Sequence, residues 1–357
     1  MKELEKILTD LPKNYPAAQI SDYIKLIYQN EFGCEHFMAE AAASLPVFKE
    51  ELHTARRGKQ LFEFIGNEFC RVYLKNAVEL GAAPETLHRM VLYTAQQRHG
   101  SAVHFEAKLE TFVQLCREKR LPFSLGAVQL YLLNYCAAGF PSTHHSNIYK
   151  ETYAPSYRVI SYDCARFFEL FLRIDRMARV KKSPIIVAID GPCASGKTTL
   201  SNMLQSCYPC HVFHTDDFYL RPEQRTAERL AEPGGNMDRE RLEREVLTPI
   251  TQQQAVAYRK YSCKTNTISK PERLPFLALN IVEGSYALHP ELRRFYDIKV
   301  VLQLSPAQQL TRLKRRESRK SMELFRERWI PLEHKYIEET GLFATADLLY
   351  SVDESSE

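Results

Sequence analysis

Two stretches of the chain combine residue types that handle phosphate. In the first, GPCASGKTT, the spacing G-x-x-x-x-G-K-[ST] is met by Gly191, Gly196, Lys197 and Thr198. Glycines let a backbone curl so that its N–H groups face a phosphate, and the dipole of a following helix adds positive potential. The lysine of such a loop reaches the β- and γ-phosphates, and the hydroxyl holds Mg²⁺. The pattern predicts a nucleotide phosphate loop. The alternative is a glycine-rich turn that carries GKT by chance.

The second stretch is HTDDFYL, residues 214–220, which contains two adjacent carboxylates. Adjacent acids are common on solvated surfaces, so the pair alone proves nothing. Asp216 follows the short stretch HVFHT, and we expect it at the carboxyl end of a strand, where open α/β sheets bind ligands. There it could accept a proton from a hydroxyl that attacks a γ-phosphate, or support Mg²⁺. Glu283 ends the run LALNIVE and could hold the metal through water.

A third stretch, RLKRRESRKSMELFRER at 312–328, is rich in arginine. One interpretation is a solvated helix face or a weak patch for nucleic acid. The other is a lid whose arginines close over the transferring phosphoryl group and neutralise its charge. Because a phosphate loop precedes it, we favour the lid, whose arginines are Arg312, Arg315, Arg316 and Arg319.

The elements that must position these residues alternate between strand and helix in 183–357. Short, continuous apolar runs rich in β-branched residues are typical of strands buried on both faces of a parallel sheet. The predicted strands are 184–190, 211–215, 277–284, 298–304 and 347–353, and the predicted helices are 197–206, 238–248, 306–318 and 320–339. This alternation predicts an open α/β sheet.

Residues 1–180 have helical periodicity instead. Apolar residues fall on one helical face in SDYIKLIYQNEF, RVYLKNAVEL, TLHRMVLYTAQQ, AKLETFVQLCREK and AVQLYLLNYC. A last helix is predicted over 159–180, and Pro184 disfavours its continuation. We therefore predict an all-α N-terminal domain, 1–180, followed by an α/β domain, 183–357.

The composition agrees with two soluble domains. The chain has 357 residues, of which 45% are hydrophobic and 26% charged. The sequence has no run of eighteen apolar residues, so we expect no membrane span. The net charge of +4 is too small to indicate, by itself, that the protein binds nucleic acid. Nine cysteines, an odd number, predict a reduced, cytoplasmic protein.

The N-terminal half contains three histidines of interest, His36, His144 and His145. They could form a metal or ligand site, but the sequence lacks a clear metal-ligand spacing. We favour histidines that pack and hydrogen-bond around a loop. The half could sense a ligand, contribute to an acceptor pocket or form a homo-oligomer.

Five motifs together resemble uridine kinase and the related phosphoribulokinase and pantothenate kinase group. They are GPCASGKTT, HTDDFYL, NMDRERLEREVL, IVEGSYAL and RRESRKSMELFRERWIPLEHKYI, in that order within 183–350. The resemblance implies a P-loop kinase domain that moves the γ-phosphoryl group of ATP, with Mg²⁺, to a hydroxyl of a nucleoside or a sugar-like molecule. Two alternatives stay open: a non-catalytic ATP-binding regulator and a polynucleotide 5′-hydroxyl kinase.

The resemblance also implies roles for single residues. Asp216 takes the place of the general base, Tyr219 lies on the nucleoside side, and Asp238 matches the acid that grips ribose. Where such enzymes place a base-reading histidine, this chain has Tyr261, Ser262 and Cys263, so the acceptor is left open. The full prediction is catalytic Asp216, Lys197, Arg315 and Arg319; nucleotide-binding Gly191, Ala194, Ser195, Gly196, Lys197, Thr198 and Thr199; substrate-binding Tyr219, Asp238, Tyr258 and Arg312; and metal-binding Thr198, Glu283 and Asp216.

Overall fold

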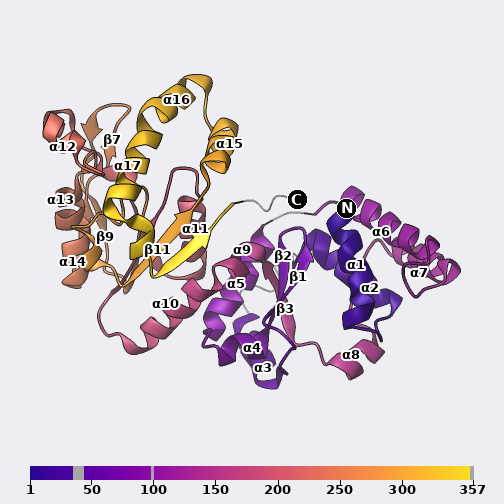
Figure 1. Ribbon diagram of the computed structural model, residues 1–357. Coiled ribbons are helices and arrows are strands. Elements are labelled where there is room, and N and C mark those ends of the chain that lie inside the picture. The colour runs from indigo at the N-terminus through magenta and orange to yellow at the C-terminus, as the bar shows by residue number, and fades with distance from the viewer. Residues whose placement is uncertain (35–43, 98–99, 354–357) are drawn as a thin grey trace. The chain divides into compact units, whose positions relative to one another are not determined.

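The computed structural model describes residues 1–34, 44–97 and 100–353. The chain divides into two compact units, Met1–Arg176 and Met177–Glu357 (Figure 1). Among the described helices, none is both long enough and apolar enough to cross a bilayer.

The first unit packs helices around a small antiparallel sheet (Figure 1). The sheet has the order β1-β2-β3, formed by Phe62–Gly66, Phe69–Tyr73 and Tyr157–Ser161. Helices α1 and α2 contact α6, and α3 contacts α5. The helices are α1 (Lys2–Asn14), α2 (Ile20–Phe32), α3 (Ser44–Thr54), α4 (Leu74–Glu79), α5 (Pro84–Gln96), α6 (Ala102–Arg117), α7 (Leu125–Ala137), α8 (Asn147–Tyr153), α9 (Tyr162–Arg166) and, running into the second unit, α10 (Phe168–Val180).

This sheet corrects the prediction of an all-α domain. The segment RVYLKNAVEL begins as the end of β2 and becomes helical only at Leu74. The helix predicted over 159–180 is in fact the end of β3, the short helix α9 and then α10. All five residues of β2 are buried, including Arg71, so the strand lacks the alternation of apolar and polar residues that marks a half-buried strand.

The second unit contains a five-stranded, fully parallel sheet of order β12-β11-β4-β10-β5. Each predicted strand is present, as β4 (Ile185–Asp190), β5 (Cys210–His214), β10 (Leu279–Glu283), β11 (Ile298–Gln303) and β12 (Leu348–Ser351). Helix α11 (Lys197–Cys207) contacts β4, β5 and β10. The central strands β4 and β10 are buried along their whole length, as continuous apolar runs require.

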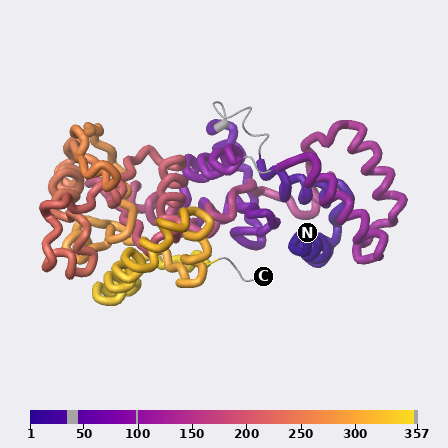
Figure 2. Tube along the Cα trace, turned by 90° about the horizontal axis from the view of Figure 1, so that it is seen from above, coloured from indigo at the N-terminus to yellow at the C-terminus, as the bar shows by residue number. Residues whose placement is uncertain are grey.

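The unit also contains helices and short strands that follow the sheet strands in the sequence. Figures 1 and 2 show α15, α16 and α17 following one another as adjacent helices. Their bounds are α15 (Pro306–Arg316), α16 (Arg319–Leu324), η6 (Phe325–Trp329) and α17 (Ile330–Thr340). A second helical run comprises α13 (Arg239–Leu242), η4 (Glu243–Leu247) and α14 (Thr248–Thr251), and two short antiparallel pairs join β6 (Val256–Tyr258) to β9 (Glu272–Leu274) and β7 (Tyr261–Ser262) to β8 (Thr267–Ile268).

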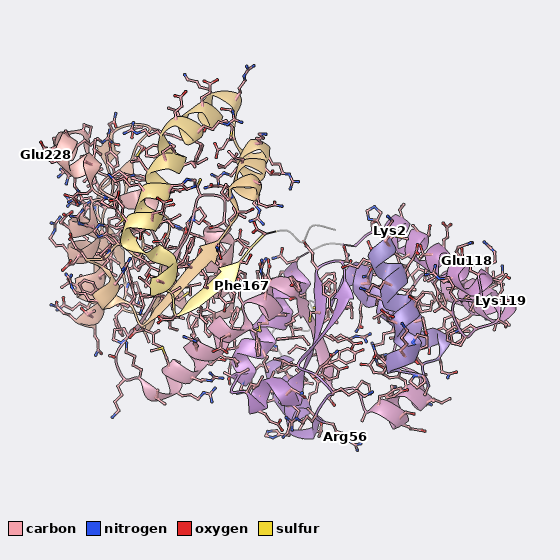
Figure 3. All side chains as sticks on the ribbon, viewed as in Figure 1. Lys2, Arg56, Glu118, Lys119, Phe167 and Glu228 are labelled. Carbon is pink, nitrogen blue, oxygen red and sulfur yellow. The ribbon has the colours of Figure 1, made fainter. Side chains whose placement is uncertain are left out.

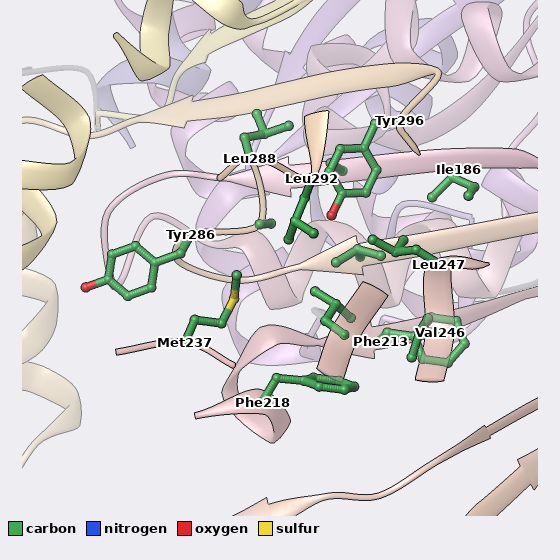
Figure 4. Packing of buried hydrophobic residues seen from close by; sticks show 14 of the residues in the cluster. Ile186, Phe213, Phe218, Met237, Val246, Leu247, Tyr286, Leu288, Leu292 and Tyr296 are labelled. Carbon is green, nitrogen blue, oxygen red and sulfur yellow. The ribbon is translucent and has the colours of Figure 1, made fainter. Parts of the chain in front are cut away.

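A hydrophobic cluster anchors these segments to the sheet (Figure 4). Phe213 of β5 and Phe218 lie in it beside Met237, Leu247 and Tyr286, all at most 2% exposed. The segment that carries Asp216 and Asp217 is therefore fixed on both sides by buried side chains. Burial of a large apolar side chain contributes about 1.5–3 kcal/mol, enough to hold such a short segment in place.

Candidate active site

The loop between β4 and α11 needs glycine at two positions. Gly191 has φ +144°, and a Cβ built on it would lie 2.3 Å from the carbonyl oxygen of Leu302. Gly196 has φ +96° and forms the N-cap of α11. A side chain at either position would strain the backbone, and at Gly191 it would also collide with β11. The loop can therefore wrap closely in front of the first turn of α11.

Lys197 and Ser195 show how the interior of this loop is arranged. The Lys197 ammonium is buried and donates to the carbonyl oxygens of Gly191 and Pro192, at 2.8 and 2.9 Å. The Ser195 hydroxyl is buried and has no hydrogen-bond partner among the described residues. An unpaired buried hydroxyl costs free energy unless a ligand satisfies it. The loop therefore offers a polar group and a cation beside the positive end of a helix.

Glu283 links the carboxyl end of β10 to the first turn of α11 and to the end of β5. It ends β10, which lies between β4 and β5. Its Oε1 accepts hydrogen bonds from the Thr198 hydroxyl, at 3.0 Å, and from Nδ1 of His214, at 2.5 Å. The pKa of His214 is raised, chiefly by that hydrogen bond and also by the charges of Asp217 and Asp216. The carboxyl ends of the parallel strands thus gather oxygen ligands that suit Mg²⁺.

The two adjacent aspartates lie in different environments. Asp216 is exposed, and its Oδ1 accepts a hydrogen bond from the Tyr219 hydroxyl at 3.1 Å. Asp217 is half-buried, and burial raises the pKa of its carboxyl. The main-chain oxygen of Asp217 also accepts a hydrogen bond from Arg241 at 2.8 Å. Asp216 is therefore the carboxylate that a ligand can reach, whereas Asp217 belongs more to the supporting structure.

Asp190, the last residue of β4, was not singled out by the motifs. It is fully buried and accepts hydrogen bonds from the main-chain N–H of Gly191 and Leu288 and from the Tyr336 hydroxyl. Burial raises the pKa of its carboxyl. An acid that ends an apolar run is the signal that could have identified it. Asp190 fixes the start of the phosphate loop against the segment that follows β10.

Glu333 of α17 holds the middle of the same loop and had no sequence signal. Both of its carboxylate oxygens lie 3.0 Å from the main-chain N–H of Cys193. The Ser285 hydroxyl donates to it at 2.9 Å and Nε2 of Gln309 donates at 3.1 Å. The carboxylate is 5% exposed. The helix that follows the arginine-rich segment is thus connected directly to the phosphate loop.

Three of the residues predicted to bind the acceptor have different surroundings. Asp238 is buried, caps α13 and contacts Arg241 at 3.3 Å and Gln224 at 3.1 Å. Tyr258 is 3% exposed and packs between the rings of Phe213 and Phe218 in the core. Tyr219 lies near Trp329, with 6.2 Å between ring centroids. Only Tyr219 is directly joined to Asp216.

Three arginines of the predicted site, Arg312, Arg315 and Arg319, also differ in their surroundings. Arg312 donates to the carbonyl oxygens of Ala194, at 3.3 Å, and Val352, at 2.6 Å, so it joins the loop to the end of β12. Arg315 and Arg319 are exposed at the end of α15 and the start of α16. Thr199 is exposed in the first turn of α11. The roles predicted for these residues stay predictions.

Comparison with solved structures finds similarity over about half of the chain, and three of these structures are 17–22% identical to it. A possible uridine kinase from Bacillus stearothermophilus has 22% identity over 51% of this chain and 99% of its own, with a TM-score of 0.38. A chain described as a fructose transport system kinase from Silicibacter sp. has 19% identity, 50% and 95% coverage and a TM-score of 0.38. Shikimate kinase from Bacteroides thetaiotaomicron has 17% identity, 48% and 89% coverage and a TM-score of 0.29. No protein-family model and no curated protein matches the chain.

Proposed function

We propose that the second unit is an ATP-dependent phosphotransferase that moves the γ-phosphoryl group to a hydroxyl of a small molecule, a nucleoside or a sugar-like compound. One observation carries the proposal. The phosphate loop lies beside Glu283, whose carboxylate contacts Thr198, and an exposed acid, Asp216, follows the neighbouring strand. Phosphoryl transfer needs a phosphate cradle, a metal and a base. The loop would be the cradle, Thr198 and Glu283 could hold the metal, and Asp216 would be the base.

The phosphate side of the reaction would depend on the loop and its metal. The loop N–H groups, the Ser195 hydroxyl and the Lys197 ammonium would bind the phosphates of ATP. Lys197 would exchange its present carbonyl partners, Gly191 and Pro192, for phosphate oxygens. The Thr198 hydroxyl and Glu283, which contact each other, would offer oxygen ligands that Mg²⁺ prefers, with Asp216 proposed as a further ligand, and the ion when bound neutralises phosphate charge.

The acceptor side would depend on Asp216. Its exposed carboxylate would take the proton from the attacking hydroxyl, while the Tyr219 hydroxyl holds it in place. Asp238 would contribute to acceptor binding only if it released Gln224 or Arg241. Arg315 and Arg319, at the junction of α15 and α16, would close over the transferring group.

The two adjacent aspartates provide the test. Asp216→Asn should lower turnover by about 10²- to 10⁴-fold, because it removes the base, while ATP binding is retained. Asp217→Asn is the matched control, with a much smaller effect. ADP release would be measured with Mg²⁺–ATP and a panel of nucleosides, sugars, pantothenate and short oligonucleotides, and nucleotide binding would be followed by the fluorescence of Trp329, the single tryptophan.

The outcomes distinguish the open alternatives. Acceleration by a nucleoside or sugar, lost in Asp216→Asn, supports the proposal. Acceleration by oligonucleotides with strong salt dependence favours a polynucleotide kinase. ATP binding without acceleration by any acceptor favours a regulator. Equal turnover of Asp216→Asn and the parent with the active acceptor would contradict the role of Asp216.

A further inference from the structure

The first unit contains a cavity of about 580 Å³ that the proposed kinase chemistry does not use. Its lining comes from α2, from the chain after α3 and from the segment 144–159. A volume of this size is typical of pockets for small ligands. The cavity is therefore a candidate binding site in its own right.

The charges around this cavity are unbalanced. Four of its lining residues are basic and one, Glu151, is acidic. The basic residues are Lys25, Arg56, Lys150 and Arg158. They come from three separate parts of the chain, so the fold, and not a local run of charge, brings them together. Gathering like charges costs free energy unless an anion offsets it.

The countercharges within the protein are few. Arg158 is paired with Glu51, and its Nε lies 2.9 Å from Oε2 of that residue. Lys25 donates to the carbonyl oxygen of Thr143 at 3.0 Å, which satisfies one donor but does not neutralise the charge. Within the described part of the chain, Arg56 and Lys150 form no ion pair with an acid. At least three of the four basic groups are thus available to an anion.

His145 and Tyr157, which are hydrogen-bonded to each other, form a polar wall of the cavity. Nδ1 of His145 donates to Asp22 at 2.7 Å, and the Tyr157 hydroxyl donates to Nε2 of His145 at 2.5 Å. The buried guanidinium of Arg71 lies 4.5 Å from the centre of the Tyr157 ring and donates to Gln29. Burial and the charges of Arg71 and Arg158 lower the pKa of Lys25 to about 8. Arg71 and Arg158 thus add positive potential at the Lys25 ammonium, which the Asp22 carboxylate offsets only in part.

We propose that this cavity binds a small molecule through its phosphate or carboxylate group, held by Lys25, Arg56 and Lys150 against the wall of His145 and Tyr157. Such a group would supply the missing negative charge and accept several charge-assisted hydrogen bonds. Both ring nitrogens of His145 are hydrogen-bonded, to Asp22 and to Tyr157, so His145 orients the wall. His36, predicted with it, lies outside the described residues.

Calorimetric titration of the full chain tests this proposal. The probes are inorganic phosphate, glycerol 3-phosphate and succinate, with glycerol as the neutral control. The phosphate loop would be occupied by a non-hydrolysable ATP analogue with Mg²⁺, and the titration repeated in Lys197→Ala, so that binding at the loop is excluded. We expect saturable binding of the phosphate probes or of succinate, and none of glycerol. Which anions bind then distinguishes a phosphate ligand from a carboxylate ligand.

Point variants locate the site. Lys25→Gln should weaken binding by at least about tenfold, because Lys25 is largely buried. Lys150→Gln, at an exposed position that should not affect folding, should weaken it by about two- to fivefold. Lys2→Gln is the matched control, because Lys2 lies far from the cavity. Arg56, which lines the cavity, and Lys2 lie at opposite ends of the unit (Figure 3). Binding that none of the cavity variants changes, or no binding of any probe, would overturn the proposal.

Discussion

The phosphate loop of the second unit and the basic cavity of the first unit both suit anions, but they present different groups. The loop offers main-chain N–H groups and one buried lysine, held in shape by Gly191, Gly196 and Glu333. The cavity offers long side chains from separate segments. Main-chain donors are fixed by the fold and carry no net charge, whereas side-chain cations respond to salt and pH. The first arrangement suits precise positioning for a reaction, and the second suits reversible binding.

Among the tests of this comparison, the largest expected effect comes from a single substitution in the phosphate loop. Lys197→Ala should lower turnover by about 10²- to 10³-fold, because it removes a cation that stabilises charge on the transferring group. The same variant should bind phosphate in the first-unit cavity as the parent does. ADP release and calorimetry measure the two properties. Turnover within tenfold of the parent would contradict the role of Lys197. A parallel loss of phosphate binding in the cavity would show that the loop and the cavity are not independent sites.

The rigidity of the phosphate loop is tested next, through Glu333. Glu333→Ala leaves the part-buried N–H of Cys193 and the side chains of Ser285 and Gln309 without this acceptor, so the free energy of unfolding should fall by about 1–3 kcal/mol. Urea unfolding followed by fluorescence reports this unit, because Trp329 is the chain's single tryptophan.

A control on the same helix makes this measurement specific. Glu338→Ala removes an exposed acid of α17 and should change the free energy of unfolding by less than about 0.5 kcal/mol. Equal effects of the two substitutions would mean that the loop does not depend on Glu333. The fixed geometry attributed to the loop would then have to come from its glycines alone.

The two units also differ in how well they could be predicted. The strands of the parallel sheet are continuous apolar runs, so β4, β10 and β11 were identified from the sequence, and the loop motif placed Gly191 and Lys197 between a strand and a helix. The small antiparallel sheet was missed. Its middle strand holds a buried Arg71 that binds Gln29 and Glu63, and no local pattern reveals that such a charge is satisfied.

The contacts that support the candidate site were missed for a related reason. His214 and Glu283 are 69 positions apart in the chain, and Cys193 and Glu333 are 140 apart. In the sequence, Glu333 reads as one more charge on an amphipathic helix. Only the order of strands and the return of α17 to the loop bring these groups together. Motifs therefore identified the groups proposed to react, but not the groups that hold them.

The last expected effect concerns pH and the wall of the first-unit cavity. Burial and the charges of Arg71 and Lys25 lower the pKa of His145 to about 4, so His145 is neutral in the folded unit at pH 7. The unfolded chain, with an ordinary pKa near 6.5, binds a proton first as the pH falls. The stabilisation that comes from keeping His145 neutral in the folded unit is therefore complete above pH 6.5. As the pH falls towards 4, it declines by about 1.4 kcal/mol per pH unit. His145→Gln should remove this slope, as measured by hydrogen exchange of residues 144–161 at several pH values. If the parent and the variant had the same slope, folding would not lower the pKa of His145. Burial and the hydrogen bond from Tyr157 to Nε2 would then not keep the ring neutral below pH 6.5.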